Sequence, residues 1–249
     1  MDASAASASR QDHVDAGTGF SLPPSLDHAR IITLPQTAYY IPDFISEEEE
    51  QMILDKVSSA PKPRWKQLTK RRLQTWPSDL VNNKLLDAPL PPWLETPVVS
   101  RLLSLPVQDS EPGHIFTQSP HKKPNHVLIN EYPPGIGIMP HKLRWIRVLA
   151  CRFKEDGALD PEPAWRILQE PRSLLITTDQ LYTDFLHGIA DIEEDTDLTA
   201  DTVANWDLLR DADAYASGRN IRQIRTSLTY RDVLQVSKVA NKLGMFLKR

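Results

Sequence analysis

Several short segments of the chain alternate between polar and apolar residues, which is the pattern of β-strands with one buried face. The clearest is Arg225–Arg231, and Val127–Asn130 and Ser173–Thr177 are further short β-rich runs. Alternation in the first of these segments would place four polar residues on one face: Arg225, Ser227, Thr229 and Arg231. A strand of this length separates the two arginine Cα atoms by roughly 20 Å.

Two arginines at the ends of one strand face suggest a carboxylate site. A guanidinium is planar and donates two parallel hydrogen bonds to a carboxylate, and each side chain can reach inward from its end of the strand. The space between Arg225 and Arg231 would suit a short dicarboxylate. The alternative interpretation is an exposed basic strand edge, and the run by itself favours that alternative.

A change to helical periodicity is expected soon after residue 46. Ser46 and Glu49 have the spacing of a capping box, and Ile53 and Val57 would share one face of a helix from Glu47 to about Ser58.

Composition indicates a compact domain, with 40% apolar and 25% charged residues among 249. We expect residues 1–29 to be a disordered tail and residues 30–249 to form the domain. The single cysteine suits a reducing compartment, and no apolar run approaches the length of a membrane span. Met1–Arg10 is rich in Ala and Ser without a signal-peptide apolar region, so we expect an intracellular location, in the nucleus, the cytoplasm or both. The sequence does not indicate an oligomeric state.

Positive charge is concentrated in residues 61–74, which carry six cations and no anions. Cations interleaved with aromatic rings can neutralise phosphates and stack on unpaired bases. The candidate residues of this basic flap are Arg64, Trp65, Lys70, Arg71, Arg72 and Trp76. An exposed strand pair with lysines guarding its edge is an equally good interpretation.

Negative charge is concentrated in residues 191–213, with nine acidic residues opposed only by Arg210. We expect a mobile insertion loop over about 190–218, and a protein-docking surface is the weaker alternative.

The order of four motifs resembles the AlkB family of Fe(II)- and 2-oxoglutarate-dependent dioxygenases. The motifs are Asn130-Glu131-Tyr132, His141, Leu186-His187-Gly188 and the Arg225–Arg231 run. Three further segments fit the same family: Tyr40–Ser46, Asn125–Asn130 and Glu170–Leu175. The resemblance covers about residues 35–142 and 154–236.

The resemblance implies a fold and a site. The fold would be mostly β, a double-stranded β-helix (jelly roll) with helices on one side. His141 and His187 would bind Fe(II), and Arg225 and Arg231 would hold the two carboxylates of 2-oxoglutarate. Asn130, Tyr132 and Ser227 would complete the pocket, and the basic flap would correspond to the lid over the substrate.

The chain departs from the family immediately after His141. The family has His-x-Asp there, whereas this chain has Leu143, and roughly twenty residues that would form two strands are missing. Non-haem iron sites of this class use two histidines and one carboxylate, so we expect weak iron binding. Glu155, Asp156 and Asp160 follow in the chain, but a solvated loop is the favoured interpretation for them.

Two functional hypotheses follow from the resemblance and the departure. The leading one is an enzyme, a dioxygenase that couples decarboxylation of 2-oxoglutarate to hydroxylation of an N-methyl group, with release of formaldehyde. Its substrate would be alkylated DNA or RNA, or a protein. The alternative is a catalytically inactive module of the same fold that binds nucleic acid or a protein.

Overall fold

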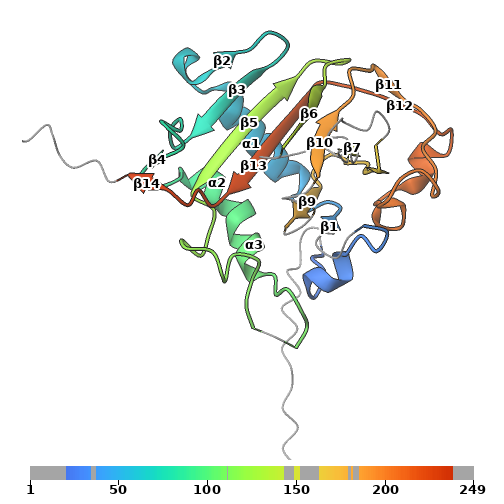
Figure 1. The fold of residues 1–249 in the computed structure, drawn as a ribbon, viewed down its shortest axis with the longest axis horizontal. Helices are drawn as coiled ribbons and strands as arrows, with labels where there is room; N and C mark the ends of the chain where they lie inside the picture. Colours follow the sequence, from blue (N-terminus) through green and yellow to red (C-terminus); the bar gives the residue numbers. More distant parts are fainter. Residues whose placement is uncertain are drawn as a thin grey trace, which may run out of the picture.

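The computed structural model describes residues 21–34, 38–110, 112–142, 149–151, 163–178, 181 and 185–237. Its largest feature is an antiparallel four-stranded sheet in the order β13–β5–β3–β2 (Figure 1). These strands are β13 (Arg225–Arg231), β5 (His126–Tyr132), β3 (Arg72–Trp76) and β2 (Lys66–Gln67). The predicted strand at Arg225–Arg231 is thus confirmed with both of its ends.

A second four-stranded sheet has the order β6–β10–β7–β8. Its strands are β6 (Ile138–Lys142), β10 (Leu186–Ile189), β7 (Leu149–Cys151) and β8 (Trp165–Arg166). Three two-stranded pairs complete the described strands. They are β1 (Ala38–Ile41) with β9 (Leu174–Thr177), β11 (Glu194–Asp195) with β12 (Asn220–Ile221), and β4 (Leu85–Leu86) with β14 (Val236–Ser237).

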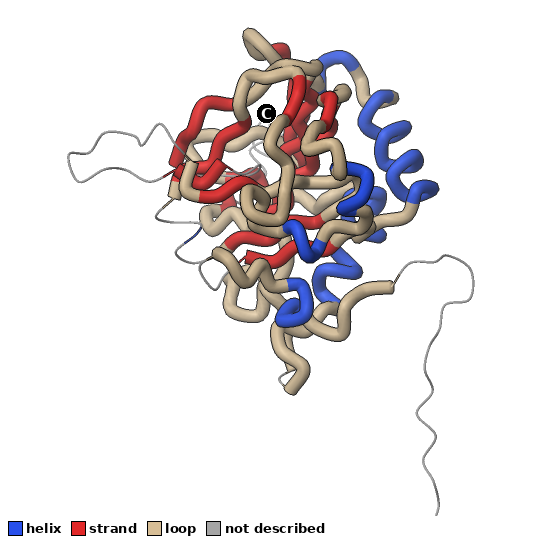
Figure 2. Tube along the Cα trace, turned by 90° about the vertical axis from the view of Figure 1, so that its right-hand side faces the viewer, coloured by secondary structure: helices blue, strands red, loops and turns tan. Residues whose placement is uncertain are grey.

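Helices cover one face of the first sheet. The longest is α1 (Glu47–Ser58), and α2 (Pro92–Leu94), the kinked segment η3 (Glu95–Val99) and α3 (Ser100–Ser104) follow one another in the chain (Figure 2). Ile53 and Val57 of α1 belong to the same buried cluster as Val127 and Ile129 of β5. The apolar positions of β5 therefore face the helices, and its alternate positions face the other way.

The start of α1 shows how local sequence fixes this packing. The Ser46 side chain accepts a hydrogen bond from the Glu49 backbone N–H, and the Glu49 carboxylate accepts one from the Ser46 N–H. The predicted capping box and the predicted limits of the helix are both confirmed. Arg101 of α3 donates to both oxygens of Glu49 at 2.5 and 2.6 Å, which ties the two helices together.

The acidic segment, residues 191–213, has a packed interior. Leu198 and Val203 are buried against Leu168, and Asn205 exchanges two hydrogen bonds with the backbone of Leu168. Two 3₁₀ turns, η4 (Trp206–Leu208) and η5 (Ala212–Tyr215), lie within it. It is therefore a structured excursion of the chain between β10 and β13.

The N-terminal part of the described chain is packed as well. The 3₁₀ turn η1 (Leu26–Ala29) lies in the stretch assigned to the tail, and both of its end residues are buried. The packed domain therefore begins at least as early as Leu26. Another short 3₁₀ turn, η2 (Lys62–Arg64), precedes β2. Within the described ranges, no helix is long and apolar enough to cross a membrane.

Candidate active site

The pairing of β13 with β5 brings the predicted cosubstrate residues together. Arg225 lies opposite Tyr132, Ser227 opposite Asn130, and Arg231 opposite His126. Directly opposite residues of an antiparallel pair share a face and have neighbouring Cβ atoms. The five residues predicted to hold 2-oxoglutarate thus lie on one face, the face turned away from α1.

This face is polar and buried. Ser227, Thr229, Asn130 and His126 are between 0% and 6% exposed. Buried polar groups are costly unless they are hydrogen-bonded, and most in folded proteins have partners. The Ser227 Oγ and Thr229 Oγ1 atoms have no hydrogen-bond partner in the part of the chain that the structure describes. A row of buried hydroxyls between two arginines is suited to a polar, negatively charged ligand.

Both arginines of the strand are held by uncharged acceptors. Arg225 Nη2 donates to Gln169 Oε1 at 2.9 Å, and its guanidinium lies 5.8 Å from the centre of the Tyr132 ring. Arg231 Nε donates to His126 Nδ1 at 3.0 Å. In these two contacts each guanidinium donates to a neutral acceptor.

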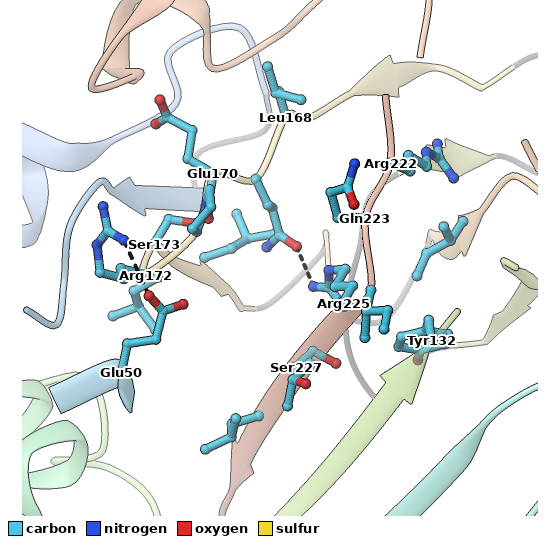
Figure 3. A pocket seen from close by; sticks show the side chains of 18 of the residues that line it. Glu50, Tyr132, Leu168, Glu170, Arg172, Ser173, Arg222, Gln223, Arg225 and Ser227 are labelled. Carbon is cyan, nitrogen blue, oxygen red and sulfur yellow. Dashed lines mark hydrogen bonds and ion pairs between the residues drawn. The ribbon is translucent and has the colours of Figure 1, made fainter. Parts of the chain in front are cut away.

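A cavity of about 390 Å³ opens beside this strand. Figure 3 shows Tyr132, Arg225 and Ser227 on one side of it and Arg172 and Ser173 on the other. Of the five predicted cosubstrate residues, Tyr132, Arg225 and Ser227 line the cavity, whereas Asn130 and Arg231 do not. The Arg225 end of the predicted site therefore borders the cavity.

The same cavity lies between two sheets. Thr226, Leu228 and Tyr230 of β13 line one wall, and Leu174 and Leu175 of β9 line another. In the described residues, β13 and β9 each pair with one neighbour only, β5 and β1. The long edge of the first sheet is thus open toward the cavity.

Arg71 of the basic flap reaches the polar face. Its Nε donates to Asn130 Oδ1 at 3.2 Å, and its guanidinium lies 5.8 Å from the centre of the Tyr132 ring. The ring of Tyr132 therefore has the guanidinium of Arg71 and that of Arg225 at equal distances. Arg71 thus belongs to the basic flap and also contacts two residues of the polar face of β5.

The remaining flap residues contact protein groups. Arg64 lies 4.1 Å from the centre of the Trp76 ring, and Arg72 lies 4.1 Å from that of Trp65. Arg72 also donates to both oxygens of Glu131, at 2.6 and 2.9 Å, and this pairing raises the pKa of its guanidinium. Lys70 forms an ion pair with Asp191. Both tryptophans thus have an arginine over the ring, so base stacking there requires these arginines to move or to stack as well.

The two predicted iron ligands occupy facing positions in the second sheet. His187 of β10 is the register partner of His141 of β6, and His187 is 3% exposed. Within the described ranges, no group of three or more His, Cys, Asp or Glu side chains could hold a metal ion. Leu143 and the alternative carboxylates Glu155, Asp156 and Asp160 lie outside the described residues. The His, Cys, Asp and Glu side chains of the described residues therefore do not form a facial iron site of two histidines and one carboxylate.

The chain matches no protein-family model. It is 35% identical over 232 residues to a Danio rerio protein named "Probable RNA/DNA demethylase ALKBH6", in an alignment covering 84% of this chain and 91% of that protein. The chain belongs to the AlkB-like family. This relationship agrees with the motif order, and it confirms the family that the Asn-x-Tyr and arginine-strand motifs indicated.

Two residues that contact the arginines of β13 were not singled out in the sequence, His126 and Gln169. His126 is fully buried and hydrogen-bonded to Arg231. Alternation along β5 could have found it, because His126, like Asn130, is an even-numbered position of the strand. No local pattern marks Gln169, because the chain between Trp165–Arg166 and Leu174 has no regular spacing that points to Arg225.

Proposed function

We propose that this chain has the scaffold of an Fe(II)- and 2-oxoglutarate-dependent dioxygenase whose reaction is the oxidative demethylation of alkylated nucleic acid. The observation that carries the proposal is the buried polar face of β13 and β5, with Arg225, Ser227 and Arg231 in one row. The name of the Danio rerio relative supports the reaction and the nucleic-acid substrate.

In this proposal 2-oxoglutarate lies along β13. Arg225 and Arg231 hold its two carboxylates through charge-assisted hydrogen bonds. The Ser227 hydroxyl, Asn130 and Tyr132 complete the pocket, and the Ser227 Oγ, which has no partner among the described residues, gains one from the ligand. A charge-assisted bond at a buried hydroxyl removes the cost of leaving that group unsatisfied.

The iron half of the site is incomplete in this proposal. His141 and His187 would ligate the ion, but the family's Asp is replaced by Leu143. Without a carboxylate to offset the charge of the ion, two imidazoles hold it weakly. We therefore propose that the chain keeps the cosubstrate pocket and has little turnover.

The open edge of β13 supports the idea that strands are missing from a double-stranded β-helix. The cavity lies between β13 and β9, which belong to different sheets. A continuous sheet that contained both strands would have to cross this space. The alignment points the same way: it extends over 232 residues but takes in only 84% of the 249 in this chain, so it contains positions at which this chain has no residue.

A second candidate function is a binding module without catalysis. The observation that favours it is the basic flap, which remains folded as the β2–β3 hairpin, combined with the loss of the carboxylate ligand. Such a module would bind single-stranded nucleic acid through Lys70, Arg71 and Arg72, or a protein partner.

Titration calorimetry separates these candidates. The 249-residue chain is titrated with 2-oxoglutarate, and in a second experiment with a single-stranded oligonucleotide that carries one N-methylated base. The proposal expects 2-oxoglutarate to bind, and the methylated oligonucleotide to bind more tightly than its unmodified control. Oligonucleotide binding without any 2-oxoglutarate binding would favour the inactive module. Binding of neither ligand would contradict the dioxygenase scaffold and the nucleic-acid-binding form of the module.

A further inference from the structure

The side chain of Arg71 joins the basic flap to the polar face of β5. Arg72 pairs with Glu131 in the β3–β5 register, so the residue before it, Arg71, comes across from Tyr132. The Arg71 Nε donates to Asn130 Oδ1 at 3.2 Å, and the guanidinium lies 5.8 Å from the centre of the Tyr132 ring. One flap residue therefore contacts two of the five residues of the proposed cosubstrate pocket.

The backbone of Arg71 is fixed where the flap hairpin closes. Its carbonyl oxygen accepts the Leu68 backbone N–H at 2.8 Å and a Gln67 side-chain N–H at 3.2 Å. Gln67 is also the register partner of Arg72 in the pairing of β2 with β3. These contacts hold the base of the Arg71 side chain, so its contact with Asn130 depends on the position of the flap.

The direction of this contact determines how the Asn130 amide is turned. An arginine side chain can only donate hydrogen bonds, so the amide atom that meets it must be the oxygen. The Nδ2 nitrogen, which carries two N–H groups, is then on the other arm of the amide. Asn130 is 4% exposed, and within the described ranges its side chain makes no hydrogen bond besides the one to Arg71.

A second donor lies beside this amide. Ser227 is the register partner of Asn130 in the β13–β5 pairing, and it is 6% exposed. Its Oγ has no hydrogen-bond partner in the described part of the chain. Facing residues of an antiparallel pair are neighbours, so an amide nitrogen and a hydroxyl can donate to one anion. An amide turned the other way would present an oxygen, which repels an anion.

We propose that Arg71 is a positioning residue that turns the Asn130 amide so that its N–H groups donate to a carboxylate of 2-oxoglutarate. This inference rests on the proposed function, because it concerns the same cosubstrate pocket. Arg71 acts through Asn130 in this role, and it makes the flap a part of the cosubstrate site.

Two substitutions of Arg71 and one control test the role. Arg71→Met keeps a long side chain and removes the donor. Arg71→Lys keeps a donor, because the lysine Nζ stands one bond beyond the position of the arginine Nε. Lys66→Met is the matched control: Lys66 belongs to β2 of the same hairpin, and it pairs with Asp79 at 2.5 Å. This control removes the same charge from the flap without touching Asn130.

The readout is the dissociation constant for 2-oxoglutarate, measured by calorimetry on each folded variant. We expect Arg71→Met to weaken binding about 5-fold, within the range for one hydrogen bond. Arg71→Lys and Lys66→Met should each stay within about 2-fold of the wild-type chain, because the first retains a donor and the second leaves the amide alone.

A double-mutant cycle decides whether Arg71 acts through Asn130. Asn130→Ala alone should weaken 2-oxoglutarate binding about 10-fold, because it removes the donor itself. In the Asn130→Ala background, Arg71→Met should change the dissociation constant by less than about 2-fold. If Arg71→Met does not fold, Arg71→Ala takes its place in both backgrounds, since alanine needs no additional space.

Three results would overturn the inference. Wild-type affinity in Arg71→Met would leave the contact a structural one. An undiminished loss in the Asn130→Ala background would show that Arg71 acts on the ligand by its charge, and an equal loss in Lys66→Met would show the same for the whole flap. If the wild-type chain itself binds no 2-oxoglutarate, the proposed function fails, an outcome distinct from these three because in them the wild-type chain binds.

Discussion

His187 lies directly opposite His141 in the antiparallel pairing of β10 with β6. The two histidines are far apart in the sequence, and the second sheet brings their backbone positions together. Cα atoms of facing residues in an antiparallel pair are about 4.5–5.5 Å apart. The pairing therefore brings together the backbone positions of the two residues that we propose as iron ligands.

The arginines of β13 provide the first prediction. Arg225→Ala and Arg231→Ala should each weaken 2-oxoglutarate binding by about 2–3 kcal/mol, because each removes a charge-assisted, bidentate contact. Arg219→Ala is the control, since Arg219 is 64% exposed and pairs only with Glu194 among the contacts seen. Calorimetric titration measures the three affinities. If both β13 variants bind 2-oxoglutarate with wild-type affinity, β13 is an exposed basic strand edge and does not hold the cosubstrate.

The basic flap provides the second prediction. Replacing Lys70, Arg71 and Arg72 together by Gln should weaken binding of single-stranded nucleic acid and reduce its salt dependence. We expect the log–log slope to fall by at least about 1, the change for one lost phosphate contact, since Asp191 and Glu131 already compete for Lys70 and Arg72.

Lys122→Gln with Lys123→Gln is the control for the flap, because these exposed lysines precede the opposite end of β5. Fluorescence anisotropy over a series of salt concentrations gives both the affinities and the slopes. If the flap variant keeps the affinity and slope of the control, the nucleic-acid assignment should be abandoned.

A partly buried ion pair at the rim of the cavity provides the third prediction. Arg222 donates to Asp195 at 2.6 Å, and both side chains are about 14% exposed or less. Arg222→Ala removes one member of this partly buried pair, so we expect a loss in the free energy of unfolding between the about 1 kcal/mol of an exposed pair and the about 3 kcal/mol of a buried one. Arg219→Ala, in the neighbouring exposed pair, should cost less than about 1 kcal/mol. Urea denaturation measures both, and equal losses would show that the Arg222 pair has no special structural role.

His126 provides a prediction of pH dependence. Its pKa is about 4 in the folded chain and 6.5 in an unperturbed imidazole, so between these values the unfolded chain binds a proton that the folded chain does not. Stability therefore falls as the pH decreases through this window, by about 3 kcal/mol in total for this residue.

His126→Asn removes the titrating group, so its unfolding free energy should fall less than that of the wild-type chain between neutral pH and about pH 4. Denaturant unfolding at a series of pH values measures the difference. Parallel pH curves for the two proteins would show that His126 is not buried in its neutral form.

Local sequence predicted the elements with strong signals. The capping box at Ser46 fixed the start of α1, and alternation fixed β13 to the residue, because both depend on neighbouring positions in the chain. The predicted strand at Val127–Asn130 extends from His126 to Tyr132 in the structure. Strand ends depend on the partner strands, here β3 and β13, and such pairings cannot be taken from local pattern.

The parts of the site that sequence did not predict depend on long-range contacts. Gln169 meets Arg225 across 56 residues of chain and Arg71 meets Asn130 across 59, and neither contact leaves a local signal. The acidic segment was expected to be a mobile loop because of its charge. Its few apolar residues, Leu198 and Val203, nonetheless find a partner in Leu168, which charge counting does not detect.

We propose that this AlkB-like chain keeps its cosubstrate pocket but lacks a complete iron site. The most direct test compares Fe(II) affinity and 2-oxoglutarate decarboxylation in two proteins. One is the 249-residue chain, and the other carries the family's His-x-Asp and the two strands after it, taken from the Danio rerio relative. A third protein with the same insertion but Ala in place of the Asp separates the effect of the ligand from that of restoring the sheet.

We predict weak Fe(II) binding and negligible decarboxylation for the 249-residue chain, and a gain in both for the restored protein only when the Asp is present. Circular dichroism on all three proteins establishes that each is folded. Robust decarboxylation by the 249-residue chain would contradict the claim, and would point to Glu155, Asp156 or Asp160 as the third ligand.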